Sequence, residues 1–258
     1  EWGLLTEALN DRIANPEASP EEKRSLRLKL AEVAASHAGA PDDAVTAYRE
    51  LIEANPNDEA AVGALDRLLR SQPERKDDLR WLFKLRIDRA PSAADAVGLL
   101  SEWAQLEEDF FEEPTRAAAV YKDLLDRNPQ HAPSLKALAR IYLAQGNADG
   151  AVQMLERERD IEEGVGRIQR EQEIARLYLG PLKEPKKALE AARRALELAP
   201  TDPKTMAIVE ELLPVAETRK DAAVVLEHQY QVANQFDKQG QIIAIVLATA
   251  NSKADRLP

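Results

Sequence analysis

The stretch HAPSLKALARIYLAQGNADGAVQMLERERDIEE, from His131 to Glu163, decides how the chain folds. In its first half, apolar residues follow the i, i+3, i+4, i+7 spacing of one helix face: Leu135, Leu138, Ala139 and Tyr142. Gly146 then interrupts the pattern, as glycine does at helix C-termini. The second half resumes a helical pattern, so the stretch predicts two consecutive helices joined by a short turn.

Small residues on the two predicted helices indicate that their backbones come close together. Ala139 belongs to the first helix and Ala151 to the second, with Leu155 one turn further on. Because alanine takes little space, the helices can approach at these positions while larger side chains fill the gap to the next pair. We therefore expect an antiparallel helical hairpin with neighbouring hairpins beside it.

A helix that ends in a small or polar residue followed by proline recurs along the chain. The prolines are Pro56, Pro91, Pro129 and Pro200, separated by 35, 38 and 71 residues, and the last interval is about twice the others. A fixed period of roughly 34 to 40 residues is typical of solenoids built from stacked helical hairpins. The recurrence therefore predicts that the hairpin at His131 is one unit of an array.

These residues resemble the tetratricopeptide repeat, with apolar and small residues on two helices and a glycine turn between them. Leu135, Leu138, Ala139, Tyr142, Gly146, Ala151 and Leu155 match that pattern in order and spacing. The second-helix signature recurs as Ala44, Tyr48, Leu51 and Pro56, as Ala117, Tyr121, Leu124 and Pro129, and as Ala188, Ala192, Ala195 and Pro200. The unit at His131 departs from the pattern at its end, where Glu163 stands in place of proline. The resemblance implies an all-α, right-handed α-solenoid superhelix of antiparallel helix hairpins, with about six units and about fourteen helices.

The chain is predicted to form one array over residues 1–258. The units are expected at roughly 21–56, 57–91, 92–129, 130–163, 164–200 and 201–235, with unpaired helices at 1–15 and 236–250. The helices are expected near 3–14, 21–38, 42–54, 58–71, 75–89, 93–111, 114–128, 132–145, 148–162, 166–179, 184–198, 202–217, 219–234 and 236–250. The chain starts at Glu1 rather than at a methionine, so we expect a fragment or a processed form.

The last predicted helix is apolar nearly all round, which is unusual for the end of a repeat array. Its apolar residues are Ile242, Ile243, Ile245, Val246 and Leu247. Either the native chain continues or another chain covers this helix, or the helix packs as a cap against the helix at 219–234.

Composition and charge exclude several classes of function. The net charge of −11 argues against the broad basic surface that nucleic-acid binding requires. The chain has no cysteine, which excludes disulfides, thiolate metal sites and cysteine nucleophiles. Apolar stretches such as 242–250 are too short to span a bilayer, so direct membrane insertion is not predicted. The absence of cysteine is compatible with the cytoplasm and with the periplasm. We expect the cytoplasm, and the periplasm stays open because the chain looks like a fragment without its native N-terminus.

No arrangement of residues predicts an enzyme. The sequence has no glycine-rich phosphate loop and no Gly-x-Ser-x-Gly elbow. His37, His131 and His228 lie far apart without ligand spacing, and the first two are expected near solvated turns. The acidic residues 107–109 and 112–113 lack calcium-loop spacing and are expected to form a solvated helix end. We therefore expect no catalytic residue, no metal and no cofactor.

The resemblance implies that the first helix of each unit lines the inner, concave wall of the superhelix. Counted from the matched residues, the inner positions are Lys29, Gln105, Lys136, Arg140, Leu143, Gln172 and Arg176. The basic side chains would hold carboxylates or phosphates of a peptide, unless Lys136 and Arg140 are simply solvated surface charges. Arg140 stands where the family's two-carboxylate clamp has asparagine, so chaperone-tail binding is not expected.

We expect a non-enzymatic scaffold that binds another protein or a peptide segment in this concave groove. The alternative is a structural module that associates with copies of itself through its uncapped ends. In that case Ile242, Ile243, Val246 and Leu247 of the last helix would form the contact in a homo-oligomer.

Overall fold

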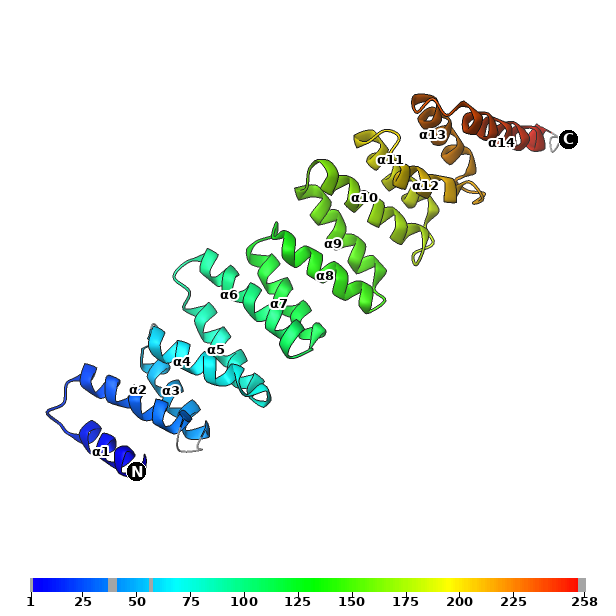
Figure 1. Cartoon of the computed structure of the whole chain (residues 1–258). Helices are drawn as coiled ribbons and strands as arrows, with labels where there is room; N and C mark the ends of the chain where they lie inside the picture. Colours follow the sequence, from blue (N-terminus) through cyan, green and yellow to red (C-terminus); the bar gives the residue numbers. More distant parts are fainter. Residues whose placement is uncertain (1, 37–40, 56–57, 255–258) are drawn as a thin grey trace. The chain divides into compact units, whose positions relative to one another are not determined.

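A computed structural model describes residues 2–36, 41–55 and 58–254, with side chains described as far as residue 247. The described residues form fourteen α-helices and include no β-strand, which confirms the predicted all-α helical-repeat solenoid (Figure 1). His37 and Pro56, which entered the sequence predictions, lie outside the described residues. Contacts between helices group the chain into two compact units, residues 1–127 (unit 1) and 128–258 (unit 2).

Unit 1 contains seven of the described α-helices, and within the unit each helix from the first to the sixth packs against the next one in the chain. They are α1 (Trp2–Ala14), α2 (Pro20–Ser36), α3 (Pro41–Ala54), α4 (Glu59–Arg70), α5 (Lys76–Asp88), α6 (Ala93–Gln105) and α7 (Pro114–Arg127). A 3-10 turn, Pro73–Arg75, precedes α5, and a π-helical turn, Leu106–Phe110, extends α6.

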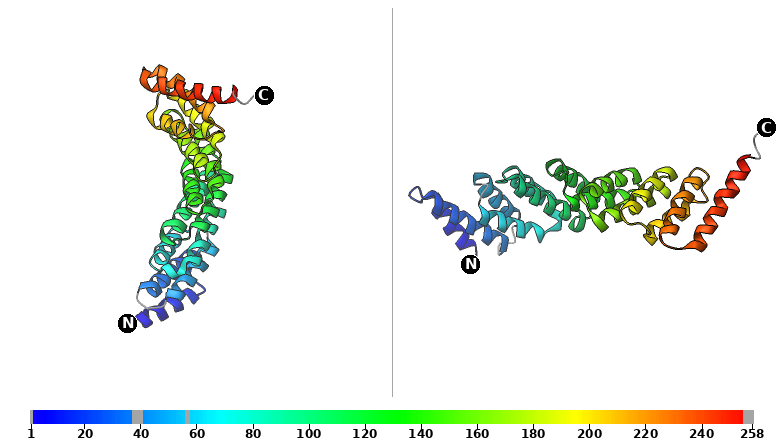
Figure 2. Two further views of the ribbon diagram at one scale, coloured as in Figure 1. Left: turned by 90° about the vertical axis from the view of Figure 1, so that its right-hand side faces the viewer. Right: turned by 90° about the horizontal axis from the view of Figure 1, so that it is seen from above.

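Unit 2 contains the other seven described helices, packed in chain order in the same way. They are α8 (Ala132–Ala144), α9 (Ala148–Ile161), α10 (Gly164–Leu179), α11 (Pro185–Leu198), α12 (Pro203–Leu212), α13 (Arg219–Val232) and α14 (Phe236–Ala254). Figure 2 shows α14, in red, lying beside α13, in orange, and the two helices are in contact.

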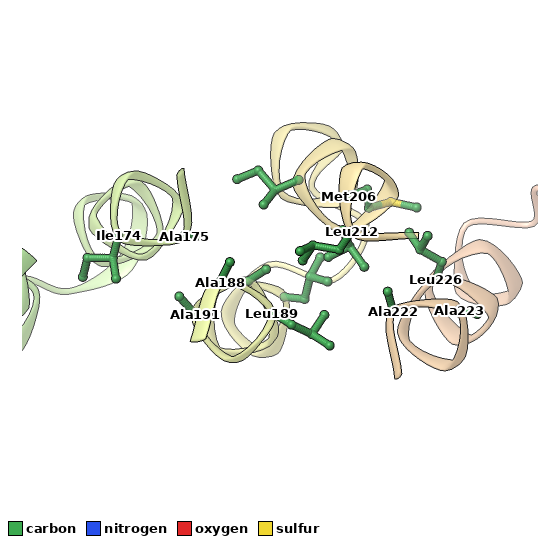
Figure 3. Close-up of a cluster of buried hydrophobic side chains, with 14 of the residues drawn as sticks. Ile174, Ala175, Ala188, Leu189, Ala191, Met206, Leu212, Ala222, Ala223 and Leu226 are labelled. Carbon is green, nitrogen blue, oxygen red and sulfur yellow. The ribbon is translucent and has the colours of Figure 1, made fainter. Parts of the chain in front are cut away.

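The core of unit 2 consists mainly of alanines and branched apolar side chains (Figure 3). Ala188, Ala191 and Ala192 of α11 are fully buried, which lets neighbouring helices approach its backbone closely. Leu212 of α12 and Leu226 of α13 are also fully buried and belong to the same core cluster. Burying a leucine of this kind stabilises the fold by about 2 kcal/mol, so the apolar stripes hold the stack together.

The turn after α8 has the glycine geometry that the sequence predicted. Gly146 has φ +73°, in the left-handed region that glycine enters without steric cost. Its N–H donates to the carbonyl of Leu143 (3.0 Å), and the N–H of Asn147 donates to the carbonyl of Tyr142 (2.8 Å). These two bonds satisfy carbonyls at the end of α8 and close the helix, so α9 can fold back against it.

The structure differs from the prediction at α12, which ends at Leu212 rather than near residue 217. Pro214 explains the difference, because proline lacks the N–H that would donate the next bond of the helix. The Thr218 hydroxyl donates to the Leu212 carbonyl (3.0 Å), and Arg219 Nε donates to the Leu213 carbonyl (3.0 Å). These side chains donate hydrogen bonds to carbonyls that would have accepted backbone N–H groups if the helix had continued.

Candidate functional site

A cavity of about 1010 Å³ opens in unit 2 along the faces of α8, α10 and α12. We call it the unit-2 groove. Five residues predicted for the inner wall line it together: Lys136, Arg140, Leu143, Gln172 and Arg176. The remaining lining residues are Ala139, Leu155, Gln169, Arg170, Glu173, Leu177, Pro203, Lys204, Ala207 and Ile208. With the exception of Leu155, which belongs to α9, every lining residue comes from the first helix of a hairpin.

The helical repeat explains why these side chains share one surface. Lys136, Arg140 and Leu143 follow the i, i+4, i+7 spacing on α8, so they project from one face of that helix. Leu135 and Leu138, on the opposite face, are fully buried. The core stripe of α8 therefore orients its polar positions toward the groove.

The floor of the groove is apolar and its mouth carries one exposed apolar side chain. Ala139, Leu155 and Ile208 are buried at the floor, and Leu143 is 44% exposed at the rim. A surface of this kind can desolvate an apolar side chain of a ligand while the surrounding polar groups fix its orientation.

Basic side chains dominate the charge of the lining, with five lysines and arginines against one glutamate. Arg170 is fixed by carboxylates, since its Nη1 lies 3.1 Å from Glu173 Oε2 and 3.4 Å from Glu158 Oε2. Burial raises the pKa of the Glu158 carboxyl, while the charge of Arg170 acts in the opposite direction. These carboxylates hold the Arg170 guanidinium in one position at the groove wall.

Two of the predicted residues already have partners on or next to α12. Gln172 Nε2 donates to Asp202 Oδ2 (2.7 Å) and to Thr205 Oγ1 (2.8 Å), which uses both hydrogens of the amide. Arg176 Nη1 lies 2.6 Å from Glu211 Oε1, and both side chains are about half exposed. These residues therefore link α10 to α12 as well as lining the groove.

Lys204 is a groove residue that sequence reasoning missed. It lies exposed in the first turn of α12 and lines the groove on the side opposite Lys136 and Arg140. Counting the inner-wall positions into the sixth predicted unit, residues 201–235, would have found it. That register was weak because the first helices of the units match the repeat pattern poorly.

The two other predicted inner-wall residues belong to unit 1. Lys29 is exposed on α2 and lines a separate cavity of about 590 Å³, together with Trp2, Tyr48 and Arg67. Gln105 is exposed at the C-terminal end of α6. The structure thus brings five of the seven predicted residues together within unit 2.

The apolar residues predicted for self-association divide between two faces of α14. Ile242 is 5% exposed and belongs to the core of unit 2, and Val246 packs against that core. Ile243 and Leu247 are 38% and 57% exposed on the other face. The helix therefore packs against its own unit through one face and presents apolar side chains on the other.

One expected solvated helix end is instead a buried ion pair. Glu107 lies in the π-helical turn after α6 with 1% of its surface exposed. Arg80 Nε and Nη2 each donate to its carboxylate at 2.7 Å, and Trp103 Nε1 donates to it at 2.8 Å. The prediction of solvation was wrong for Glu107, because a pattern of acidic letters does not reveal a basic partner on another helix.

The expectation of a solvated histidine was also wrong at His131. Its side chain is half-buried, and Nδ1 lies 2.8 Å from Ser134 Oγ. Burial lowers the pKa of the imidazole. This histidine therefore helps to fix the start of α8.

The described residues contain neither a metal-binding cluster nor a membrane-spanning helix. No group of three or more His, Cys, Asp or Glu side chains is arranged there to hold a metal ion. None of the helices in that part of the chain combines the length and apolarity needed to cross a bilayer.

Sequence comparison identifies repeats at two places in the chain. Family models described as tetratricopeptide repeat match residues 25–58 and residues 112–161. The second match contains the α8–α9 hairpin whose residues carry the repeat pattern. No curated protein matches the chain.

Solved structures with a similar course of helices share little sequence with this chain. The MamA protein is 20% identical, with a TM-score of 0.37, over 76% of this chain and 92% of its own. A thermophilic TPR protein of Thermus thermophilus, TTC0263, is 23% identical, with a TM-score of 0.33, over 74% of this chain and 100% of its own. YrrB, described as a TPR protein with an unusual peptide-binding site, is 13% identical, with a TM-score of 0.36, over 81% of this chain and 100% of its own. At these scores the family assignment rests on the two sequence matches.

Proposed function

Since the chain is a tetratricopeptide-repeat protein, we propose that it is a non-enzymatic scaffold that binds a segment of a partner protein in the unit-2 groove. The observation that carries the proposal is the convergence of five predicted inner-wall residues on one cavity with an apolar floor. Repeat arrays commonly use such extended surfaces to bind other chains. Apolar contacts at the floor would supply affinity, and the charged rim would set the orientation of the partner.

A double charge reversal tests the groove directly. In Lys136→Glu/Arg140→Glu, two basic side chains on the α8 wall become acidic, while the buried face of α8 is unchanged. We expect recovery of the partner in a pull-down from the source cells to fall at least about tenfold, because charge reversal at an interface adds repulsion to the lost attraction.

The matched control carries the same charge change outside the groove. Lys186 and Arg193 are exposed on α11 and do not line the cavity. The variant Lys186→Glu/Arg193→Glu should recover the partner as well as the wild-type chain does. Equal recovery by the groove variant and the wild type, with both folded by circular dichroism, would remove the groove assignment.

A second candidate function is self-association through α14, which the exposed face of that helix favours. Ile243 and Leu247 would form the contact, while Ile242 and Val246 would support the helix from within unit 2. Sedimentation at several concentrations tests this, with Ile243→Lys/Leu247→Lys as the disrupting variant. A wild-type chain that stays monomeric over the concentration range would rule it out.

A further inference from the structure

Some polar side chains of the unit-2 groove are already engaged within the protein, whereas two lysines on different helices are available to a ligand. Both amide hydrogens of Gln172 are donated to Asp202 and Thr205, so this side chain has none left for a ligand. Arg170 and Arg176 are held by carboxylates of their own unit. The positive charge that a ligand can bind must therefore come from groove residues other than Arg170 and Arg176.

Lys136 and Lys204 are two groove cations whose side chains are exposed and are not engaged in this way. Lys136 is exposed on α8 and Lys204 is exposed on α12, with α10 between them along the groove. Within the described part of the chain neither ammonium group donates a hydrogen bond or forms an ion pair at contact distance. The charge of Lys136 lowers the pKa of buried Glu158 through a Coulombic interaction, without a hydrogen bond or an ion pair between them.

The floor between these lysines is apolar, with Ala139, Ala207 and Ile208 among its residues. Lysine acts as a point charge rather than as a planar fork, so it suits single carboxylates and does not require a fixed ligand geometry. A ligand that matches this surface carries a carboxylate at each end and an apolar side chain between them.

We propose, building on the proposed function, that the unit-2 groove takes an internal acidic segment of a partner protein in extended form, with Lys136 and Lys204 holding carboxylates on either side of a central apolar side chain. The segment needs no free C-terminus, because recognition rests on two separated ammonium groups. α10 packs against α12, and α8 and α10 both pack against α9; with packed helices about 8 to 10 Å apart, the two lysines are on the order of 20 Å apart. An extended chain rises about 3.3 Å per residue, which places the two acidic residues roughly six positions apart.

Charge complementarity favours this occupant over others. The groove lining is basic on a chain whose net charge is −11, so the positive surface is local. A cavity of unit 1 along α4 and α6 shows the contrast, since Glu59, Asp95 and Glu102 outnumber Arg86 and Arg89 in its lining. An acidic segment should therefore bind the unit-2 groove in preference to that cavity, and its binding should weaken as salt is added.

Selection from a peptide library tests the chemistry without assuming one sequence. Random twelve-residue peptides, displayed with their C-termini fused to a carrier, are selected on the full chain, on Lys136→Glu/Lys204→Glu and on the control Lys186→Glu/Arg193→Glu. We expect the wild type and the control to enrich sequences in which acidic residues flank an apolar one. The groove variant should lose these sequences.

Binding of one designed probe then measures each lysine separately. The peptide Ac-DSPLPSD-NH2 is blocked at both ends and carries its two carboxylates six positions apart around a leucine. We expect Lys136→Glu and Lys204→Glu each to weaken its affinity about tenfold, and the Asn-for-Asp version of the peptide to show no measurable binding. An RNA oligonucleotide of similar charge should compete poorly, because the two lysines present no continuous basic track.

The outcomes separate this inference from the function on which it rests. Groove-dependent enrichment of basic or uncharged peptides would leave the scaffold function standing and overturn the acidic segment. Absence of acidic peptides from the selection, equal probe binding by the lysine variants, or tighter binding of the RNA would also overturn it. If no peptide of any kind depends on the groove, the proposed function fails together with the inference.

Discussion

Glu171 of α10 and Arg194 of α11 form a two-point ion pair across the hairpin. Arg194 Nε lies 2.7 Å from Glu171 Oε1, and Arg194 Nη2 lies 3.0 Å from Glu171 Oε2. The Glu171 side chain is 1% exposed, and the bonds to it raise the pKa of the Arg194 guanidinium. A buried carboxylate with this geometry fixes how the two helices of the hairpin face each other.

Removal of the arginine should destabilise unit 2. Arg194→Ala leaves the Glu171 carboxylate buried, and among the described residues its remaining ion-pair partner is Arg159, at 3.5 Å. We expect the free energy of unfolding to fall by about 2 to 4 kcal/mol, since a buried carboxylate that loses its closest cation is costly. Urea unfolding followed by circular dichroism measures the change. Glu190→Gln, at an exposed position on the same helix, should stay within about 0.5 kcal/mol of the wild type.

The buried pair of Arg80 and Glu107 offers a parallel test in unit 1. Glu107→Gln removes the charge that faces a guanidinium whose side chain is 8% exposed, so we expect a loss of about 2 to 3 kcal/mol. Trp2, Trp81 and Trp103 are the three tryptophans of the chain and all belong to unit 1, so tryptophan fluorescence follows this unit. Asp109→Asn, at an exposed site nearby, serves as the control. Equal midpoints for the two variants would contradict a stabilising role for the pair.

Stability at low pH should depend on Asp58. Arg24 Nη2 donates to Asp58 Oδ1 at 2.6 Å, and this pairing lowers the pKa of the carboxyl below its ordinary value of 3.8. A carboxyl with a lowered pKa contributes stability that is complete above its ordinary value and is lost as the pH falls toward the lowered one. At pH 7, Asp58→Asn should cost about 1 to 2 kcal/mol, because the charged bond to Arg24 is lost while asparagine can still cap α4.

The check for Asp58 is a series of unfolding curves from pH 7 to pH 2. The difference between Asp58→Asn and the wild type should shrink toward the acid end of the series. A difference that stays constant through this range would mean that the ionised carboxylate is not the source of the stability.

Two glycines should respond in opposite ways to alanine. Gly146 has φ +73°, so Gly146→Ala should destabilise the chain by about 1 kcal/mol. Gly63 lies inside α4, where an added Cβ meets no atom within 4 Å, so Gly63→Ala should stabilise the chain by about 0.5 to 1 kcal/mol. Thermal unfolding of the two variants beside the wild type measures both changes. Loss of stability in both would contradict the assigned backbone geometry at Gly63.

Short-range pattern was enough to predict most of the helices. The spacing from Leu135 to Tyr142 and the glycine at 146 predicted α8 and its end, since both signals act within a few residues. Pro214 carried the signal for the early end of α12, but the apolar residues around it suggested that the helix continued. Local chemistry therefore outweighed periodicity at that position.

Side-chain partners on other helices could not be predicted in this way. Gln172 pairs with Asp202 and Thr205, about thirty positions later, and Arg176 pairs with Glu211. Periodicity tells which face of a helix a residue occupies but not which acidic group stands opposite it. Five of the residues that the register assigned to the inner wall line one cavity, and the register left open which of them keep their charge for a ligand.

Contacts between consecutive helices have a consequence for how the protein is made. Within the described residues of each unit, every helix packs against the one that follows it, from α1 to α7 and from α8 to α14. Contacts that are close in sequence favour rapid folding, and they form as soon as the next helix has been synthesised. Each hairpin can therefore bury its apolar stripe while the chain is still leaving the ribosome. A growing chain of this kind exposes one unfinished edge at a time to chaperones and to aggregation.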